Sequence, residues 1–203
     1  FDIYTTDMER ADGIIEAYDQ NVDVLNCSWQ WDIPPTMPNL ITGALDLCLI
    51  LGRYDGTPQL PLNSRGMVVV FCSHNQGTST LPHPQRHSPD RMLIVGAVDA
   101  RGIRSDWKTP PYTLPFPNLI ASNFGDELDV VAPGSDVYTT FHFAGSTVPY
   151  DYEWGTSFAA PYVAGIAALI LSEKPCLTNL QVNSIIEKTA KRINPHIYFY
   201  RTP

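Results

Sequence analysis

Apolar and polar residues alternate along the chain in blocks that change from helical to extended periodicity. Residues 8–20 carry apolar side chains at helical spacing and predict a helix, and residues 22–27 predict a short strand directly after it. Residues 40–52 form a second, strongly apolar helical segment that ends at a glycine. The uninterrupted apolar run at 67–72 is rich in β-branched residues and predicts a strand that is covered on both faces.

The second half of the chain continues this alternation. Residues 91–98 and 128–132 predict two more short buried strands. A helix of small residues is predicted over 157–172, and an amphipathic helix over 180–191 with Thr178 as its N-cap. Strands that alternate with helices predict an α/β fold, a parallel sheet with helices on both faces. In such sheets, ligands bind in the loops at the carboxyl ends of the strands.

Prolines and glycines concentrate in three stretches, 33–39, 52–66 and 109–118, which we expect to be surface loops. The sequence contains no internal repeat and no low-complexity tract. Its 203 residues are enough for one sizeable hydrophobic core. We therefore expect residues 1–203 to belong to one domain.

Charge and composition exclude several classes of function. The chain carries 13 basic and 21 acidic residues, a net charge of −8, so no positive field favours nucleic acid as a partner. The longest nearly apolar run, residues 163–171, is about half of the ~20 residues that a membrane-spanning helix requires. We therefore expect no membrane crossing. A nucleotide-binding α/β domain is also excluded, because the sequence has neither GxGxxG nor GxxxxGK.

The four cysteines, Cys27, Cys48, Cys72 and Cys176, lie far apart and form no C-x-x-C pair. This spacing indicates neither a zinc site nor a disulfide framework. Two of them, Cys27 and Cys72, sit inside apolar runs, so we expect them to be buried free thiols.

The segment GTSFAAPYVAG at residues 155–165 is the most informative motif. Proline in a helix interior loses a hydrogen bond and clashes with the preceding turn, so Pro161 must lie close to a helix start. Ser157 then lies near the helix N-terminus, where unpaired N–H groups and the helix dipole stabilise negative charge beside a serine Oγ. Because Thr or Ser before an alanine-rich helix is also a common N-cap, the tripeptide Gly-Thr-Ser alone leaves both roles open.

The whole segment resembles the nucleophile signature of the subtilisin-like serine proteases, the subtilase or peptidase S8 family. Five further stretches resemble the same family in the same chain order: DVLNCS at 23–28, VVVFCSHNQG at 68–77, LIVGAVD at 93–99, ASNFG at 121–125 and LDVVAPG at 128–134. The resemblance extends from about residue 8 to residue 194.

The resemblance implies acyl transfer on polypeptide substrates, with Ser157 as the nucleophile. It gives Asn75 the role of an oxyanion donor, together with the backbone N–H of Ser157, although Asn before Gln-Gly is by itself more often a turn residue. It also implies that Ser28, Trp29 and Gln30 bind an extended substrate through their backbone.

Two positions depart from the family pattern at the expected substrate pocket. Ser73 and His74 stand where the family usually has Ala-Gly, so the resemblance makes them walls of the pocket for the P1 side chain, narrowed or reshaped by the imidazole. Gln30 likewise replaces a usual glycine. Because Asn75 already fills the family's role at this strand end, we interpret His74 as a pocket-wall or structural residue and not as a catalytic one.

The catalytic Asp and His of the family precede the strand at 22–27 in chain order, and we assign neither. None of the five histidines is followed by Gly-Thr, and Asp7 and Asp12 lack the apolar strand that should precede them. We therefore expect the C-terminal portion of a subtilisin-like peptidase domain, without the N-terminal strands of its sheet and nearly inactive alone. The alternative is a non-catalytic peptide-binding module, against which the intact Ser157 and Asn75 argue.

Calcium often stabilises this family, but the sequence offers no Asp-rich ligand loop, so we assign no metal and no other cofactor. The family resemblance also implies a secreted or cell-envelope protein. The remaining partners that we expect are the polypeptide substrate and the missing N-terminal part of the catalytic domain.

Overall fold

The computed structural model describes residues 6–29, 39–56, 64–108, 120–140 and 149–193. These residues contain a four-stranded parallel sheet in the order β1-β2-β3-β4. Its strands are β1 (Val24–Cys27), β2 (Val68–Cys72), β3 (Leu93–Val98) and β4 (Val130–Pro133). All four lie within the apolar segments that predicted them, apart from Pro133 at the end of β4. The predicted α/β class is therefore confirmed.

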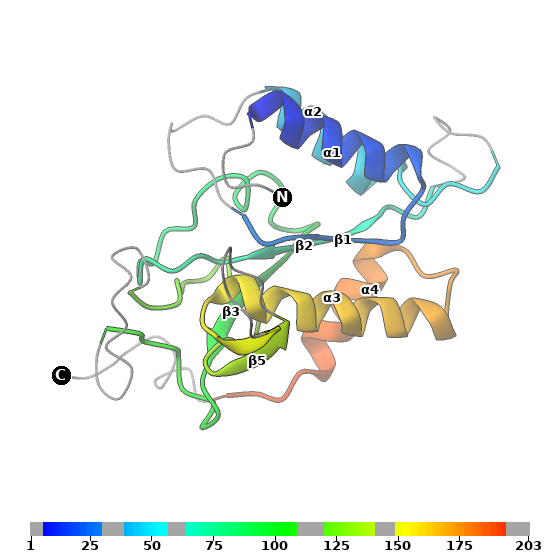
Figure 1. The fold of residues 1–203 in the computed structure, drawn as a ribbon. Coiled ribbons are helices and arrows are strands. Elements are labelled where there is room, and N and C mark those ends of the chain that lie inside the picture. The colour runs from blue at the N-terminus through cyan, green and yellow to red at the C-terminus, as the bar shows by residue number, and fades with distance from the viewer. Residues whose placement is uncertain (1–5, 30–38, 57–63, 109–119, 141–148, 194–203) are drawn as a thin grey trace.

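Helices cover both faces of the sheet (Figure 1). One face carries α1 (Asp7–Asp19) and α2 (Asn39–Asp46), which continues into the π-helical segment η1 (Leu47–Leu51). The other face carries α3 (Thr156–Glu173) and α4 (Asn179–Thr189). The helix predicted over residues 40–52 is thus α-helical at its start and π-helical at its end.

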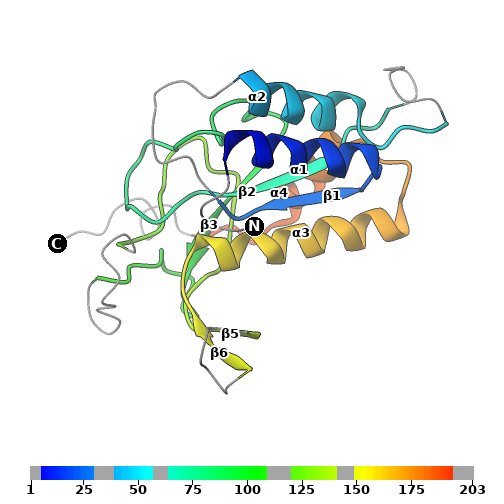
Figure 2. The same ribbon diagram turned by 45° about the horizontal axis from the view of Figure 1, so that its top comes forward.

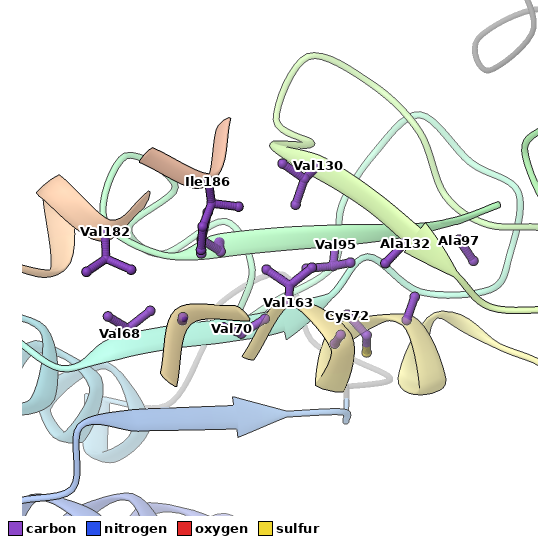
Figure 3. Close-up of a cluster of buried hydrophobic side chains, with 14 of the residues drawn as sticks. Val68, Val70, Cys72, Val95, Ala97, Val130, Ala132, Val163, Val182 and Ile186 are labelled. Carbon is purple, nitrogen blue, oxygen red and sulfur yellow. The ribbon is translucent and has the colours of Figure 1, made fainter. Parts of the chain in front are cut away.

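Each face of the sheet has its own hydrophobic core, because successive side chains of a strand point to opposite faces. Val69 and Phe71 of β2 join the cluster under α1 and α2, whereas Val68 and Val70 join the cluster under α3 and α4. Figure 3 shows Val163 of α3 among the strand side chains of this second cluster. Both central strands, β2 and β3, are buried along their whole length, as their continuous apolar runs predicted.

The prediction that Thr178 caps the last helix is confirmed. Its side chain accepts the Gln181 N–H, and the Gln181 side chain accepts the Thr178 N–H, so the two residues form a capping box. Thr6 and Glu9 form the same motif at the start of α1. The prediction of free thiols also holds, because all four cysteines are unpaired and Cys27, Cys48 and Cys72 are buried.

An antiparallel pair of strands, β5 (Val137–Thr140) and β6 (Tyr150–Glu153), was not predicted from the sequence. The pair extends away from the main sheet near the start of α3 (Figure 2). The ring of Tyr138 lies 5.8 Å from that of Tyr150 and 5.1 Å from that of Tyr152, and all three side chains are exposed. Cross-strand aromatic contacts stabilise this ribbon, and it buries little apolar surface. Its sequence therefore lacks the alternation of apolar and polar residues that predicts a strand.

Within the described part of the chain, α3 has the length and apolar composition of a membrane-spanning helix. That sign is weak, since core helices give it too, and α3 packs against all four strands of the main sheet. Most of the three predicted proline- and glycine-rich loops lies outside the described residues.

Candidate active site

Ser157 is the second residue of α3 and is half-buried. The chain enters this helix through Gly155, whose N–H donates to the Gly134 carbonyl directly after β4 at 2.9 Å. A Cβ on Gly134 would lie 2.8 Å from the Gly155 carbonyl oxygen, so this approach of two backbones requires a glycine. The start of α3 is thereby fixed at the carboxyl edge of the sheet, and Ser157 lies near the helix N-terminus, as the motif predicted.

The end of β1 also contacts Ser157, and the presence of Pro161 makes this contact possible. Proline has no N–H, so the Ser157 carbonyl lacks the partner that a regular helix would give it four residues later. Ser28, directly after β1, donates its hydroxyl to this carbonyl at 2.8 Å, and Asn26 donates its side-chain amide to the Ser28 Oγ at 3.0 Å. The side chain of Ser28 therefore holds the nucleophile candidate in place, a role that the sequence did not indicate.

Asn75 follows β2 and is brought next to Ser157 by Thr156. Its Oδ1 accepts the Thr156 backbone N–H at 3.0 Å and the Thr156 hydroxyl at 2.9 Å. Because an N–H can only donate, these bonds place Oδ1 toward Thr156 and turn the Nδ2 donors away from it. Asn75 is half-buried.

The first turn of α3 supplies another donor. The structure records no acceptor for the Ser157 N–H within the part of the chain that it describes. With the Asn75 Nδ2 group it gives two neutral donors at the start of α3, where Asn75 is bonded to the residue that precedes Ser157. Such a pair can hold an oxyanion at a helix N-terminus without a counter-charge.

The two pocket residues expected from the sequence, Ser73 and His74, are both buried. The Ser73 Oγ and the His74 Nε2 have no hydrogen-bond partner among the described residues. Burial lowers the pKa of His74 to about 3, so this imidazole is neutral near pH 7.

The expected peptide-binding segment is described only in part, since Gln30 lies outside the described residues. The Trp29 ring contacts Phe71 edge-on at 5.4 Å between centroids, and the Arg10 guanidinium lies 5.5 Å from the same ring. The Trp29 side chain thus packs against the core under α1.

No histidine or carboxylate is hydrogen-bonded to Ser157 among the residues that the structure describes. His87 pairs its Nε2 with Asp46 of α2 at 2.9 Å, but α2 lies on the opposite face of the sheet from α3 (Figure 1). Burial raises the pKa of Asp129 to about 7, but this residue precedes β4 at the amino edge of the sheet. Neither group is placed to take the proton of the serine.

Cys72 lies near the hydroxyls of Thr156 and Ser157, which lower its pKa, but burial has the larger effect and raises that pKa to about 11. A neutral thiol cannot act as the base at neutral pH. The described residues also contain no group of three His, Cys, Asp or Glu side chains that could hold a metal ion. The family's structural calcium therefore stays an expectation without candidate ligands.

The described residues thus form a parallel α/β sheet with a serine at the start of α3 and an asparagine bonded to the residue before it. The profile of the subtilase family matches residues 4–200, so the chain belongs to this family of serine proteases.

Individual relatives agree with this assignment. Subtilisin of Bacillus pumilus is 32% identical over 191 residues, which cover 92% of this chain and 56% of the relative. Subtilisin E of Bacillus subtilis (strain 168) is also 32% identical over 191 residues, which cover 92% of this chain and 40% of the relative. The chain thus spans about half the length of these relatives.

Two solved structures share the fold. A protease from Pseudoalteromonas arctica matches with a TM-score of 0.65 and 27% identity, over 90% of this chain and 51% of that one. The prenylagaramide maturation protease PagA matches with a TM-score of 0.69 over 97% of this chain and 62% of that one. At 21% identity, the second likeness concerns the fold alone.

Proposed function

We propose that this chain is the nucleophile-bearing part of a serine endopeptidase that hydrolyses polypeptides by acyl transfer. Ser157 Oγ attacks the scissile carbonyl, and its proton passes to a base. The oxyanion accepts hydrogen bonds from the Asn75 Nδ2 and the Ser157 N–H, and water then releases the acyl group. The observation that carries this proposal is the pair of Thr156 donors on the Asn75 Oδ1, which leaves the Nδ2 group to the substrate.

The base belongs, in this proposal, to further chain of the same protein, which supplies the family's catalytic His and Asp. Support comes from a surface beside the site. Tyr162, Ile166 and Leu169 of α3 are 48%, 48% and 68% exposed, an apolar stripe unusual for a core helix. β1 pairs with β2 alone among the described strands, so its other edge is open to another strand. Further chain that covers the apolar stripe of α3 and pairs with the open edge of β1 would bring the missing base to Ser28 and Ser157.

By family analogy we propose a secreted or cell-envelope location and an extended polypeptide as substrate, bound along Ser28 and Trp29 by backbone hydrogen bonds. The second candidate function, a non-catalytic peptide-binding module, follows from the lack of a described base at Ser157.

Turnover of a quenched fluorescent peptide library by the purified full-length protein separates the two functions. Ser157→Ala should lower kcat/KM by at least about a thousandfold, because alanine has no hydroxyl with which to form the acyl intermediate. Ser172→Ala, an exposed serine of the same helix, is the matched control and should retain normal turnover. Undiminished turnover in Ser157→Ala would overturn the nucleophile assignment. Peptide binding without turnover in the unmodified protein would establish the module instead.

A further inference from the structure

His74 occupies a position with a strained backbone directly beside the oxyanion amide. Its φ is 87°, a conformation that favours glycine, yet a buried imidazole stands there. Its N–H donates to the Thr156 Oγ1 at 3.1 Å, and its carbonyl accepts the Asn123 N–H at 2.8 Å. The residue is therefore held on both sides, between the nucleophile's neighbour and the segment that follows Ala121.

A chain of amide contacts determines which ring nitrogen carries the proton. The Asn123 Oδ1 accepts the backbone N–H groups of Gln76 and Thr78 at 3.0 and 3.2 Å, which turns the Asn123 Nδ2 toward the Gln76 Oε1 at 3.5 Å. The Gln76 Nε2 then faces the His74 Nδ1 at 3.4 Å. Because an amide nitrogen only donates, Nδ1 is the acceptor and the proton of the neutral ring lies on Nε2.

This Nε2–H is a buried donor without a partner in the described part of the chain, and so is the hydroxyl of the preceding residue, Ser73. Leaving a buried donor unpaired is unfavourable, so native proteins pair almost all of them with protein, water or ligand. The low pKa of His74 agrees with a neutral ring that carries one proton. Two adjacent residues at the end of β2 thus each present an unsatisfied polar atom next to Asn75.

The position of the substrate follows from the proposed function, on which this inference rests. With the scissile carbonyl oxygen at the Asn75 Nδ2 and its carbon at the Ser157 Oγ, the P1 side chain leaves from the adjacent Cα. Because His74 directly precedes Asn75 in the chain, we expect the P1 side chain to approach the His74 ring. We propose that His74 determines specificity by donating a hydrogen bond from Nε2 to an oxygen acceptor on the P1 side chain.

The acceptor that fits this site is an amide carbonyl, so the P1 residues are Asn and Gln. A buried carboxylate would lose its hydration without gaining a counter-charge, because the ring is neutral. Apolar side chains of the same shape leave the Nε2–H unpaired, and sites built to bond a polar group reject the analogue that lacks it.

Peptides that differ only at P1 test this selection in the full-length protein. Asn and Leu have nearly the same shape, as do Gln and Met, and Asp adds the charge. The expected kcat/KM is about tenfold or more higher for Asn than for Leu, and for Gln than for Met, the size of one buried hydrogen bond. Asp should be a poorer substrate residue than Asn. An apolar preference, or a preference for Asp over Asn, would overturn the proposal.

Two variants test whether the His74 ring causes the preference for Asn and Gln at P1. His74→Phe keeps an aromatic ring but has no nitrogen, so the Asn-to-Leu ratio should fall to about one or below. His74→Gly removes the ring and suits the φ of 87°, so it should lose the same ratio and accept larger P1 side chains. If the ratio survives in both variants, His74 does not contact P1.

A binding readout that does not depend on turnover separates this proposal from the proposed function. In Ser157→Ala, the ¹⁵N chemical shifts of the imidazole should show a protonated Nε2 at neutral pH. Adding a peptide with Asn at P1 should shift the Nε2–H resonance, whereas its Leu analogue should leave the resonance unchanged. Failure of the endopeptidase proposal appears as no turnover with any P1 residue. Failure of the present one appears as a protonated Nδ1 or as equal shifts with both peptides.

Discussion

The helices α3 and α4, which lie on the same face of the sheet, begin in opposite ways. At the start of α4, Thr178 and Gln181 exchange hydrogen bonds of 2.9 and 3.3 Å and cap each other's backbone. At the start of α3, Gly155 provides no side-chain cap, and the Thr156 N–H is directed to an amide on another strand end. The cap on α4 pairs backbone N–H groups of its own first turn. The start of α3 instead leaves its N–H groups for partners outside the helix.

This difference shows how a site can be built from an ordinary helix. An uncapped N-terminus costs the helix about 1 kcal/mol, but its N–H groups are then fixed before any ligand arrives. The stability of α3 comes from its buried face, where Ala159, Ala160 and Val163 pack closely on the strands. In α4, capping and burial both serve stability, and no group is left over for chemistry.

The largest loss of activity is expected at Asn75, whose amide is oriented by the start of α3. Asn75→Ala should lower kcat by about 10²–10³-fold with little change in KM, the size that loss of one oxyanion donor has in subtilisin itself. Steady-state kinetics of the full-length enzyme measure it. The control is Asn183→Ala in α4, whose amide donates to the Arg91 carbonyl at 3.0 Å and should affect stability alone. A rise in KM with unchanged kcat would contradict the oxyanion role of Asn75.

A smaller effect is expected at Thr156, which positions that amide. Thr156→Val removes the hydroxyl bond to the Asn75 Oδ1 but keeps the backbone N–H bond, so kcat should fall by about tenfold. Thr156→Ser restores the hydroxyl and should recover most of the activity, while thermal unfolding controls for folding. If Val and Ser behave alike, the hydroxyl does not orient Asn75.

Ser28 and Pro161 should show a coupled effect of a few-fold. Ser28→Ala leaves the Ser157 carbonyl unpaired, which should loosen the nucleophile and lower kcat. Pro161→Ala restores the N–H that a regular helix offers to this carbonyl, so the loss caused by Ser28→Ala should be smaller in that background. A double-mutant cycle in kcat measures the coupling. Equal losses in both backgrounds would mean that the Ser28 bond does not hold Ser157.

The smallest effect on activity is expected at the start of α4. Thr178→Ala should lower the free energy of unfolding by about 1 kcal/mol through loss of the cap, measured by urea denaturation. The kcat/KM should not change, because this helix end takes no part in the site. A loss of activity at unchanged stability would mean that α4 contributes to function as well.

Much of the fold could be predicted because its elements are set by local pattern. The continuous apolar runs of β2 and β3 and the Thr178 cap act through neighbouring residues. Pro161, by contrast, lies inside α3, beyond the first turn in which the motif predicted it. The β5–β6 ribbon escaped prediction because its tyrosines are exposed and stack across strands. Its pairing therefore has no counterpart in the burial pattern.

The candidate site residues could be proposed from the sequence, but the contacts that connect them could not. Ser157 and Asn75 came from motifs, whereas Thr156 stood in the same motif without a role. The orientation of the Asn75 amide depends on a bond between residues 81 positions apart, and Ser28 reaches Ser157 across 129 positions. No local spacing encodes such contacts, because they arise only when separate strand ends meet at one helix.

The most direct test of the account is labelling of the native full-length protein with a fluorophosphonate, followed by peptide mapping of the adduct. Such reagents modify a serine only where a base and an oxyanion site activate it. The account predicts one adduct, on Ser157, which disappears when the protein is unfolded beforehand and is strongly reduced in Asn75→Ala. An adduct on another residue, or no adduct in a protein that hydrolyses peptides, would contradict it.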